Sequence, residues 1–135
     1  MPNTEHDAKE ESRHSERQRF LDLASEADPQ RCAYGHAGIG DLAISDGEPE
    51  AAVRELRLAL ALAPRQPHFH YLLGFAYGQM ERWPEAEASL QMAVELQPGT
   101  AEYLRCLGWV LCNSKQGVRG RGLLDEAREI EPRNP

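Results

Sequence analysis

Residues 67–100, PHFHYLLGFAYGQMERWPEAEASLQMAVELQPGT, decide the fold of this chain. The first half places residues at three- and four-residue spacings, as on one face of an amphipathic helix: His70, Leu73, Gly74 and Tyr77. A turn follows at 81–83, and Pro84 stands where the start of a second helix tolerates proline. The second half carries its apolar residues on one side and ends at Pro98: Ala86, Leu90, Ala93, Val94 and Leu96. This stretch predicts two helices joined by a short turn.

The same pattern recurs along the chain at an interval of 34 residues. Four residue types keep this interval through three cycles: Gly40, Gly74 and Gly108; Leu56, Leu90 and Leu124; Ala59, Ala93 and Ala127; Pro64, Pro98 and Pro132. Three repeats are therefore expected, at residues 33–66, 67–100 and 101–135, the last period closing at residue 134. Stacked helix pairs of this kind form an all-α solenoid.

The period, the helix–turn–helix pattern and the order Leu-Gly, Tyr, Ala and Pro resemble the tetratricopeptide repeat family. The resemblance implies a solenoid of three helix–turn–helix repeats, in which the repeated residues pack helices together and bind nothing. The family usually has Trp at the fourth position of each repeat, where this chain has other residues: His36, His70 and Leu104. Tyr77 keeps the aromatic residue that follows the glycine, whereas Ala43 and Leu111 replace it in the flanking repeats.

The two ends of the chain depart from the repeat. Residues 1–15 have no large apolar side chain after Met1, so a disordered tail is expected there. Residues 16–32 carry Phe20 and Leu23 on one helical face, which predicts an N-terminal capping helix ending at Asp28. In repeat 3, three glycines stand in the second helix: Gly117, Gly120 and Gly122. Each costs about 1 kcal/mol relative to alanine, so this helix is expected to start near Leu123 or to fray.

Composition and motifs argue against several functions. The chain has 22 Asp and Glu against 15 Lys and Arg, a net charge of −7, which disfavours nucleic-acid binding. No apolar stretch approaches the roughly 18 residues that a membrane span needs, and a cytoplasmic protein is expected. The three cysteines include no Cys-x-x-Cys pair: Cys32, Cys106 and Cys112. His68 and His70 would point in nearly opposite directions on a helix, so they cannot share a metal.

No catalytic constellation, metal site or cofactor site follows from these residues, and we expect the chain not to be an enzyme. Arginine outnumbers lysine 13 to 2, a bias more typical of a GC-rich and therefore bacterial genome.

The resemblance also implies a binding surface, because the second, fifth, ninth and twelfth positions of each first helix line the concave face in that family. In this chain these positions are Tyr34, Ala37, Asp41 and Ile44, then His68, Tyr71, Phe75 and Gly78, then Glu102, Arg105, Trp109 and Cys112. Among them, the predicted partner-binding residues are Tyr34, Asp41, His68, Tyr71, Phe75, Glu102, Arg105 and Trp109.

Aromatic side chains at such positions are typical anchors of a protein interface, and internal packing is the alternative role for them. Family members that hold acidic chaperone C-termini use Lys, Arg and Asn at groove positions. The corresponding positions here include Ala37, Asp41, Phe75 and Glu102, so that clamp is absent. An apolar or amphipathic segment of another protein is the expected partner.

Two further functions remain open alongside this adaptor. The third repeat has no predicted cap, so the chain could be a self-assembling scaffold. Net charges of −3, −2, −3 and +1 for residues 1–32, 33–66, 67–100 and 101–135 would permit head-to-tail contacts. A secretion-type chaperone, which shields amphipathic segments of an exported protein, has a similar plan of three repeats and an N-terminal helix.

Overall fold

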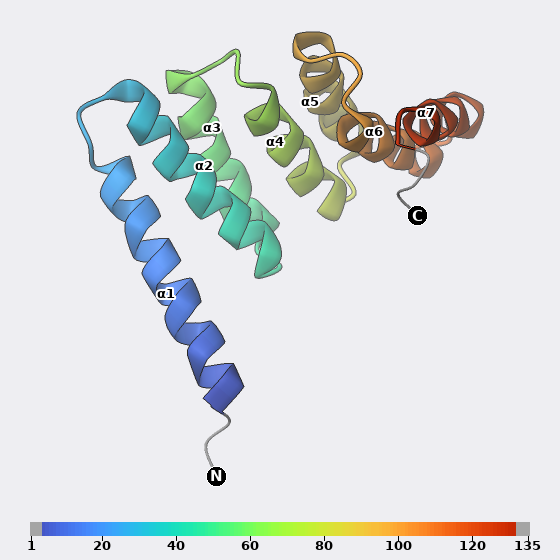
Figure 1. Ribbon diagram of the computed structural model, residues 1–135. Helices are drawn as coiled ribbons and strands as arrows, with labels where there is room; N and C mark the ends of the chain where they lie inside the picture. Colours follow the sequence, from blue (N-terminus) through green and yellow to red (C-terminus); the bar gives the residue numbers. More distant parts are fainter. Residues whose placement is uncertain (1–3, 132–135) are drawn as a thin grey trace.

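The computed structural model describes residues 4–131, and all its regular elements are helices. They are α1 (Thr4–Ala24), α2 (Pro29–Ser45), α3 (Pro49–Leu62), α4 (Pro67–Gln79), α5 (Trp83–Leu96), α6 (Ala101–Asn113) and α7 (Gly117–Ile130). Figure 1 shows them following one another in chain order from blue α1 to red α7. Each helix packs mainly on its neighbours in sequence, while α2 also touches α4 and α4 touches α6. The prediction of an all-α solenoid of three helix pairs with an N-terminal helix is confirmed.

The repeated glycines and leucines pack against each other inside every helix pair. A Cβ atom built on each glycine would lie within 3.0 Å of the leucine Cγ of the following helix, at 2.9 Å for Gly40 and Leu56, 2.5 Å for Gly74 and Leu90, and 2.8 Å for Gly108 and Leu124. Only glycine allows the two helices to approach this closely. The 34-residue period therefore records one packing contact made three times.

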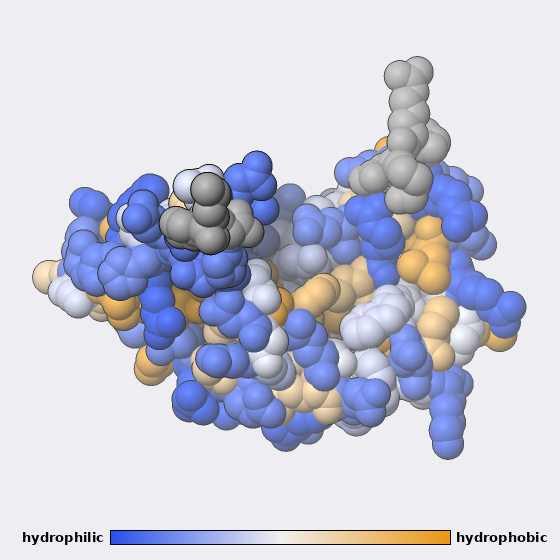
Figure 2. Space-filling view, turned by 90° about the horizontal axis from the view of Figure 1, so that it is seen from below, coloured by the Kyte–Doolittle hydropathy of each residue, from blue (hydrophilic) through white to orange (hydrophobic). Residues whose placement is uncertain are grey.

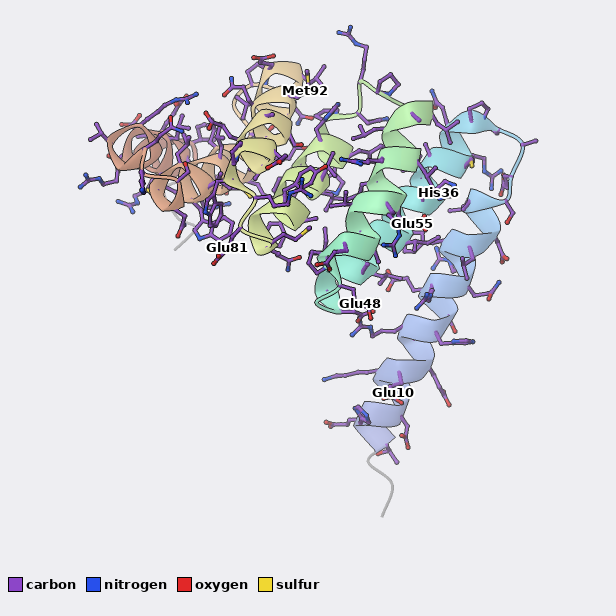
Figure 3. All side chains as sticks on the ribbon, turned by 180° about the vertical axis from the view of Figure 1, so that it is seen from behind. Glu10, His36, Glu48, Glu55, Glu81 and Met92 are labelled. Carbon is purple, nitrogen blue, oxygen red and sulfur yellow. The ribbon has the colours of Figure 1, made fainter. Side chains whose placement is uncertain are left out.

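The remaining signature positions also serve packing. Tyr77 is 4% exposed, accepts a hydrogen bond from Arg57 at 2.7 Å through its hydroxyl, and lies under the Arg82 guanidinium. His36, at the position where the family has Trp, joins α2 to α3 through a 2.7 Å contact between its Nδ1 and Glu55 Oε2. Figure 3 labels this pair on the rear of the molecule. His70, at the same position of repeat 2, instead contacts the Pro64 carbonyl oxygen of the preceding loop at 2.7 Å.

The N-terminal helix is longer than predicted. It begins at Thr4 and ends at Ala24, so residues 4–15 are helical and the expected tail is wrong for them, while residues 1–3 lie outside the described range. Acidic Glu5 and Asp7 occupy the first turn, where the helix dipole favours them, and His6 pairs with Glu10 one turn later at 2.8 Å. The tail was predicted because residues 1–15 lack an apolar pattern. The segment 4–15 is nevertheless helical, and it is rich in charged residues that favour helix formation.

Helix α1 covers the free side of α2 through two close contacts. The Phe20 ring lies 2.2 Å from the Cβ position of Gly38, and the Ala24 backbone lies equally close to that of Gly35. Because α1 stops at Ala24, Asp28 is free to cap α2, and its Oδ1 accepts a hydrogen bond from the Gln30 amide at 3.3 Å. Repeat 1 consequently begins its first helix before residue 33.

The last helix is also longer than predicted, because α7 begins at Gly117 and not near Leu123. Gly120 is buried where α7 crosses α6, and its Cβ position lies 2.7 Å from the Gly108 carbonyl oxygen. Tertiary packing at this glycine offsets the helix propensity that it lacks. Pro132, which closes the third period, lies outside the described residues.

Candidate functional site

Helices α2, α4 and α6 line the concave face of the solenoid. Figure 2 shows this face as a hollow between the two ends of the chain, with pale and orange surface on its floor. The first helices form it because α2 touches α4 and α4 touches α6, whereas the second helices contact only the helices next to them in sequence.

One cavity of about 510 Å³, named here the α6 hollow, lies between α4, α6 and α7. Six of its lining residues are predicted concave-face positions: Tyr71, Phe75, Glu102, Arg105, Trp109 and Cys112. Sequence reasoning missed the other two, Cys106 and Leu124. The sequence predicted only a packing role for Leu124. In the structure it packs against Gly108 and also lines the hollow.

Aromatic side chains form the α4 wall of the α6 hollow. Tyr71 stacks on Tyr103 with ring centroids 5.1 Å apart. The Phe75 ring, one turn along α4, has its centroid 6.3 Å from that of Tyr71. His68 also stacks on Tyr71, with ring centroids 5.7 Å apart. Tyr71 and Phe75 are half-buried: each ring packs against a neighbour and also lines the hollow.

The polar rim brings the Glu102 carboxylate and the Tyr71 side chain together, since both line the α6 hollow. Burial is the main cause that raises the pKa of Tyr71 well above 10.0, followed by Glu102 and by the charge of Asp41. Burial, assisted by Glu102, likewise raises the pKa of the Cys106 thiol to about 12. Cys106 is therefore a protonated, apolar part of the floor.

Trp109 and Phe75 line both the α6 hollow and a second cavity of about 570 Å³, which Gly78 and Trp83 also line. Its indole is 42% exposed, and it meets Trp83 edge-on at 5.5 Å. Arg105, on the same helix, forms an ion pair with Glu131 at 3.7 Å. Trp109 thus presents a large apolar surface to two cavities at once.

The predicted residues of repeat 1 are placed differently. Tyr34 is 50% exposed, meets Phe69 edge-on at 5.4 Å and accepts a hydrogen bond from Gln66, but it does not line the α6 hollow. Asp41 is exposed. Ala37 and Ile44 are buried, so these two concave-face positions belong to the core.

The described part of the chain offers no group of three or more His, Cys, Asp or Glu side chains placed to hold a metal ion. No helix among residues 4–131 is long and apolar enough to cross a membrane.

The family model described as Tetratricopeptide repeat matches residues 43–110, half of the chain. No curated protein matches the sequence. Among solved structures, MamA covers 98% of this chain over 76% of its own length, at 19% identity and a TM-score of 0.79. MamA 41-end from Desulfovibrio magneticus RS-1 covers 87% over 75% of its length, at 22% identity and a TM-score of 0.71.

A third solved structure is the first TPR of Spaghetti (RPAP3) bound to the HSP90 peptide SRMEEVD. It covers 78% of this chain over 83% of its own length, at 17% identity and a TM-score of 0.75. At these identities the structural likeness concerns the fold, and the family match supplies the assignment. The chain belongs to the tetratricopeptide repeat family.

Proposed function

We propose that this chain is a non-catalytic adaptor whose concave face binds an apolar or amphipathic segment of another protein. The observation that carries the proposal is the α6 hollow, where Tyr71, Phe75 and Trp109 leave apolar surface open. None of the three belongs to the repeated glycine–leucine contacts that hold the helix pairs together. Large aromatic side chains that are half exposed in a cavity are the usual anchors of a protein interface.

The binding mode follows from the chemistry of the hollow. An apolar side chain of the partner would enter between Phe75 and Trp109 and displace water from both rings. Glu102 and Arg105, at the polar rim, would hold the partner's backbone or polar groups in register.

The RPAP3 repeat that binds SRMEEVD supports a peptide-binding use of this fold. The groove of this chain differs in charge from a carboxylate clamp, because Asp41 and Glu102 would repel an acidic peptide.

Affinity capture from the source lysate tests the proposal, with Phe75→Ala/Trp109→Ala compared with wild type by mass spectrometry. These two residues occupy equivalent positions of repeats 2 and 3. A matched control is Leu58→Ala/Met92→Ala, which removes two exposed apolar side chains at equivalent positions of α3 and α5. Neither control residue lines either cavity, and Figure 3 labels Met92 on α5. The groove variant should lose the partner while the control keeps it. Equal recovery by all three proteins would contradict the proposal.

A second candidate function is association between copies through α7. Val118 is 82% exposed and Ile130 is 43% exposed on this helix, which leaves apolar surface uncovered. Size exclusion with light scattering at several concentrations tests it. A mass that stays at one chain throughout would remove this candidate.

A further inference from the structure

The charges on the concave face show which kind of segment it fits, an inference that rests on the proposed function. Asp41 on α2 and Glu102 on α6 are both exposed. Within residues 4–131, neither carboxylate forms an ion pair with a Lys, Arg or His side chain. The face therefore holds two negative charges that the protein itself does not neutralise.

The positive charge on this face is already compensated. Arg105, which lines the α6 hollow, pairs with Glu131 at 3.7 Å. Arg119, on α7, is held outside the hollow by Glu87 at 2.8 Å and by Gln91 at 3.4 Å. The uncompensated charge that a partner meets is consequently negative.

Both carboxylates act on the same aromatic residue although they come from different repeats. After burial, which is the largest cause, Glu102 and the charge of Asp41 both help to raise the pKa of the Tyr71 hydroxyl. Glu102 lines the α6 hollow together with Tyr71 and Phe75, and Asp41 lies on α2, which packs against the α4 helix that carries both aromatic residues. Negative charge and apolar surface adjoin within one site.

We propose that the α6 hollow binds a basic amphipathic segment of another protein, with a bulky apolar side chain between Phe75 and Trp109 and a Lys or Arg facing Asp41 and Glu102. Complementary charge at such a rim selects the partner and suppresses acidic competitors. The net charge of −7 makes a second copy of this chain a poorer occupant than a basic segment.

Three synthetic peptides test this inference. They share Phe and Leu on one helical face and differ only on the other, which carries Lys, Gln or Glu. Calorimetric titration of the full chain at low salt should give a dissociation constant about tenfold lower for the Lys peptide than for the Glu peptide, with the Gln peptide between them. Higher salt should narrow this difference, because screening weakens exposed charge pairs.

Charge variants locate the effect. Asp41→Asn/Glu102→Gln should reduce the preference for Lys over Glu to about twofold, because the two carboxylates are its source. Glu126→Gln/Glu129→Gln removes the same charge from exposed positions of α7 that do not line the hollow, and it should retain the preference. Circular dichroism checks that both variants remain helical.

The outcomes separate the two proposals. If the Glu or Gln peptide binds as tightly as the Lys peptide, and binding still requires Phe75 and Trp109, the charge inference is overturned while the adaptor function stands. If no peptide binds, or if binding ignores Phe75→Ala/Trp109→Ala, both proposals are overturned. If the chain self-associates and the Lys peptide does not compete, the occupant is a second copy, and the inference fails.

Discussion

Gly78 and Trp109 fit together across two repeats: a Cβ atom on Gly78 would lie 2.7 Å from Cζ3 of the Trp109 indole. The missing side chain on α4 is what allows this ring from α6 to lie over α4 and to line both cavities. The position of Trp109, a proposed apolar anchor, thus depends on a glycine in the neighbouring repeat.

Gly78→Ala should displace the Trp109 indole. Because the indole is 42% exposed, it can move, and alanine favours the helix by about 1 kcal/mol. We expect the free energy of unfolding to change by less than about 1 kcal/mol, while Trp109 emission shifts to the red and partner binding weakens. Trp83→Phe leaves Trp109 as the reporting tryptophan, since the chain has two. Unchanged emission would show that Gly78 does not position the ring.

Gly120→Ala should destabilise the third repeat. The new Cβ would lie 2.7 Å from the Gly108 carbonyl oxygen and 2.9 Å from the Cys112 amide nitrogen, and backbone atoms cannot move aside cheaply. Urea unfolding should show a loss of about 1–3 kcal/mol. Gly122→Ala is the matched control, because nothing lies within 4 Å of its Cβ position. The control should gain about 0.5–1 kcal/mol, and the prediction fails if both variants gain.

Glu81→Gly and Lys115→Gly should each stabilise the chain. These residues have φ angles of 56° and 69°, in the left-handed region, and Gly47 has 73° at the same position of repeat 1. A residue with a side chain in the left-handed region costs the folded state about 1 kcal/mol, which glycine would remove. Glycine also raises the conformational entropy of the unfolded chain, which offsets part of this gain. A net gain of about 0.5 kcal/mol for each variant is expected in thermal unfolding. Gly47→Ala should lose about 1 kcal/mol, and the reverse order would contradict this account.

The stability of the fold should fall in alkaline solution. Burial raises the pKa of Cys106 from 9.0 to about 12, and burial also raises that of Tyr71 above 10.0. Since the folded state holds these protons more tightly than the unfolded state, their contribution is complete below pH 9 and is lost as the pH rises toward 12. The slope for one thiol is at most about 1.4 kcal/mol per pH unit.

Urea unfolding between pH 8 and pH 11 measures this fall. Cys106→Ala should show a shallower decline from about pH 9 upward than wild type. At pH 8, a thiol reagent should modify exposed Cys112 well before Cys106. Equal reaction rates for these two thiols would contradict the burial of Cys106.

The sequence was sufficient to predict the repeat and its helices, because the 34-residue period reflects local packing. Gly74 and Leu90 illustrate this, since they stand a fixed distance apart in the chain and touch in the structure. Residues 4–15 and Gly120 were predicted wrongly for opposite reasons. The first segment is helical without an apolar pattern, and at Gly120 packing outweighs propensity.

The site was only partly predictable. Family positions identified most of the α6 hollow, yet Cys106 and Leu124 also line it, on two helices that pack against each other. The ring contact between Tyr71 and Tyr103 joins two repeats, and no local pattern encodes it. The family positions also overpredicted the concave face. Ala37 and Ile44 occupy such positions in repeat 1, yet both are buried in the core.

The most direct test of concave-face binding is the dissociation constant of the tightest-binding of the three peptides. It would be measured for wild type, Phe75→Ala/Trp109→Ala and the control Leu58→Ala/Met92→Ala. We predict that the groove variant binds at least about thirtyfold more weakly, as expected for the loss of interface anchors, and that the control stays within about twofold. Equal affinity of the groove variant and wild type, or equal weakening of both variants, would contradict binding at this face.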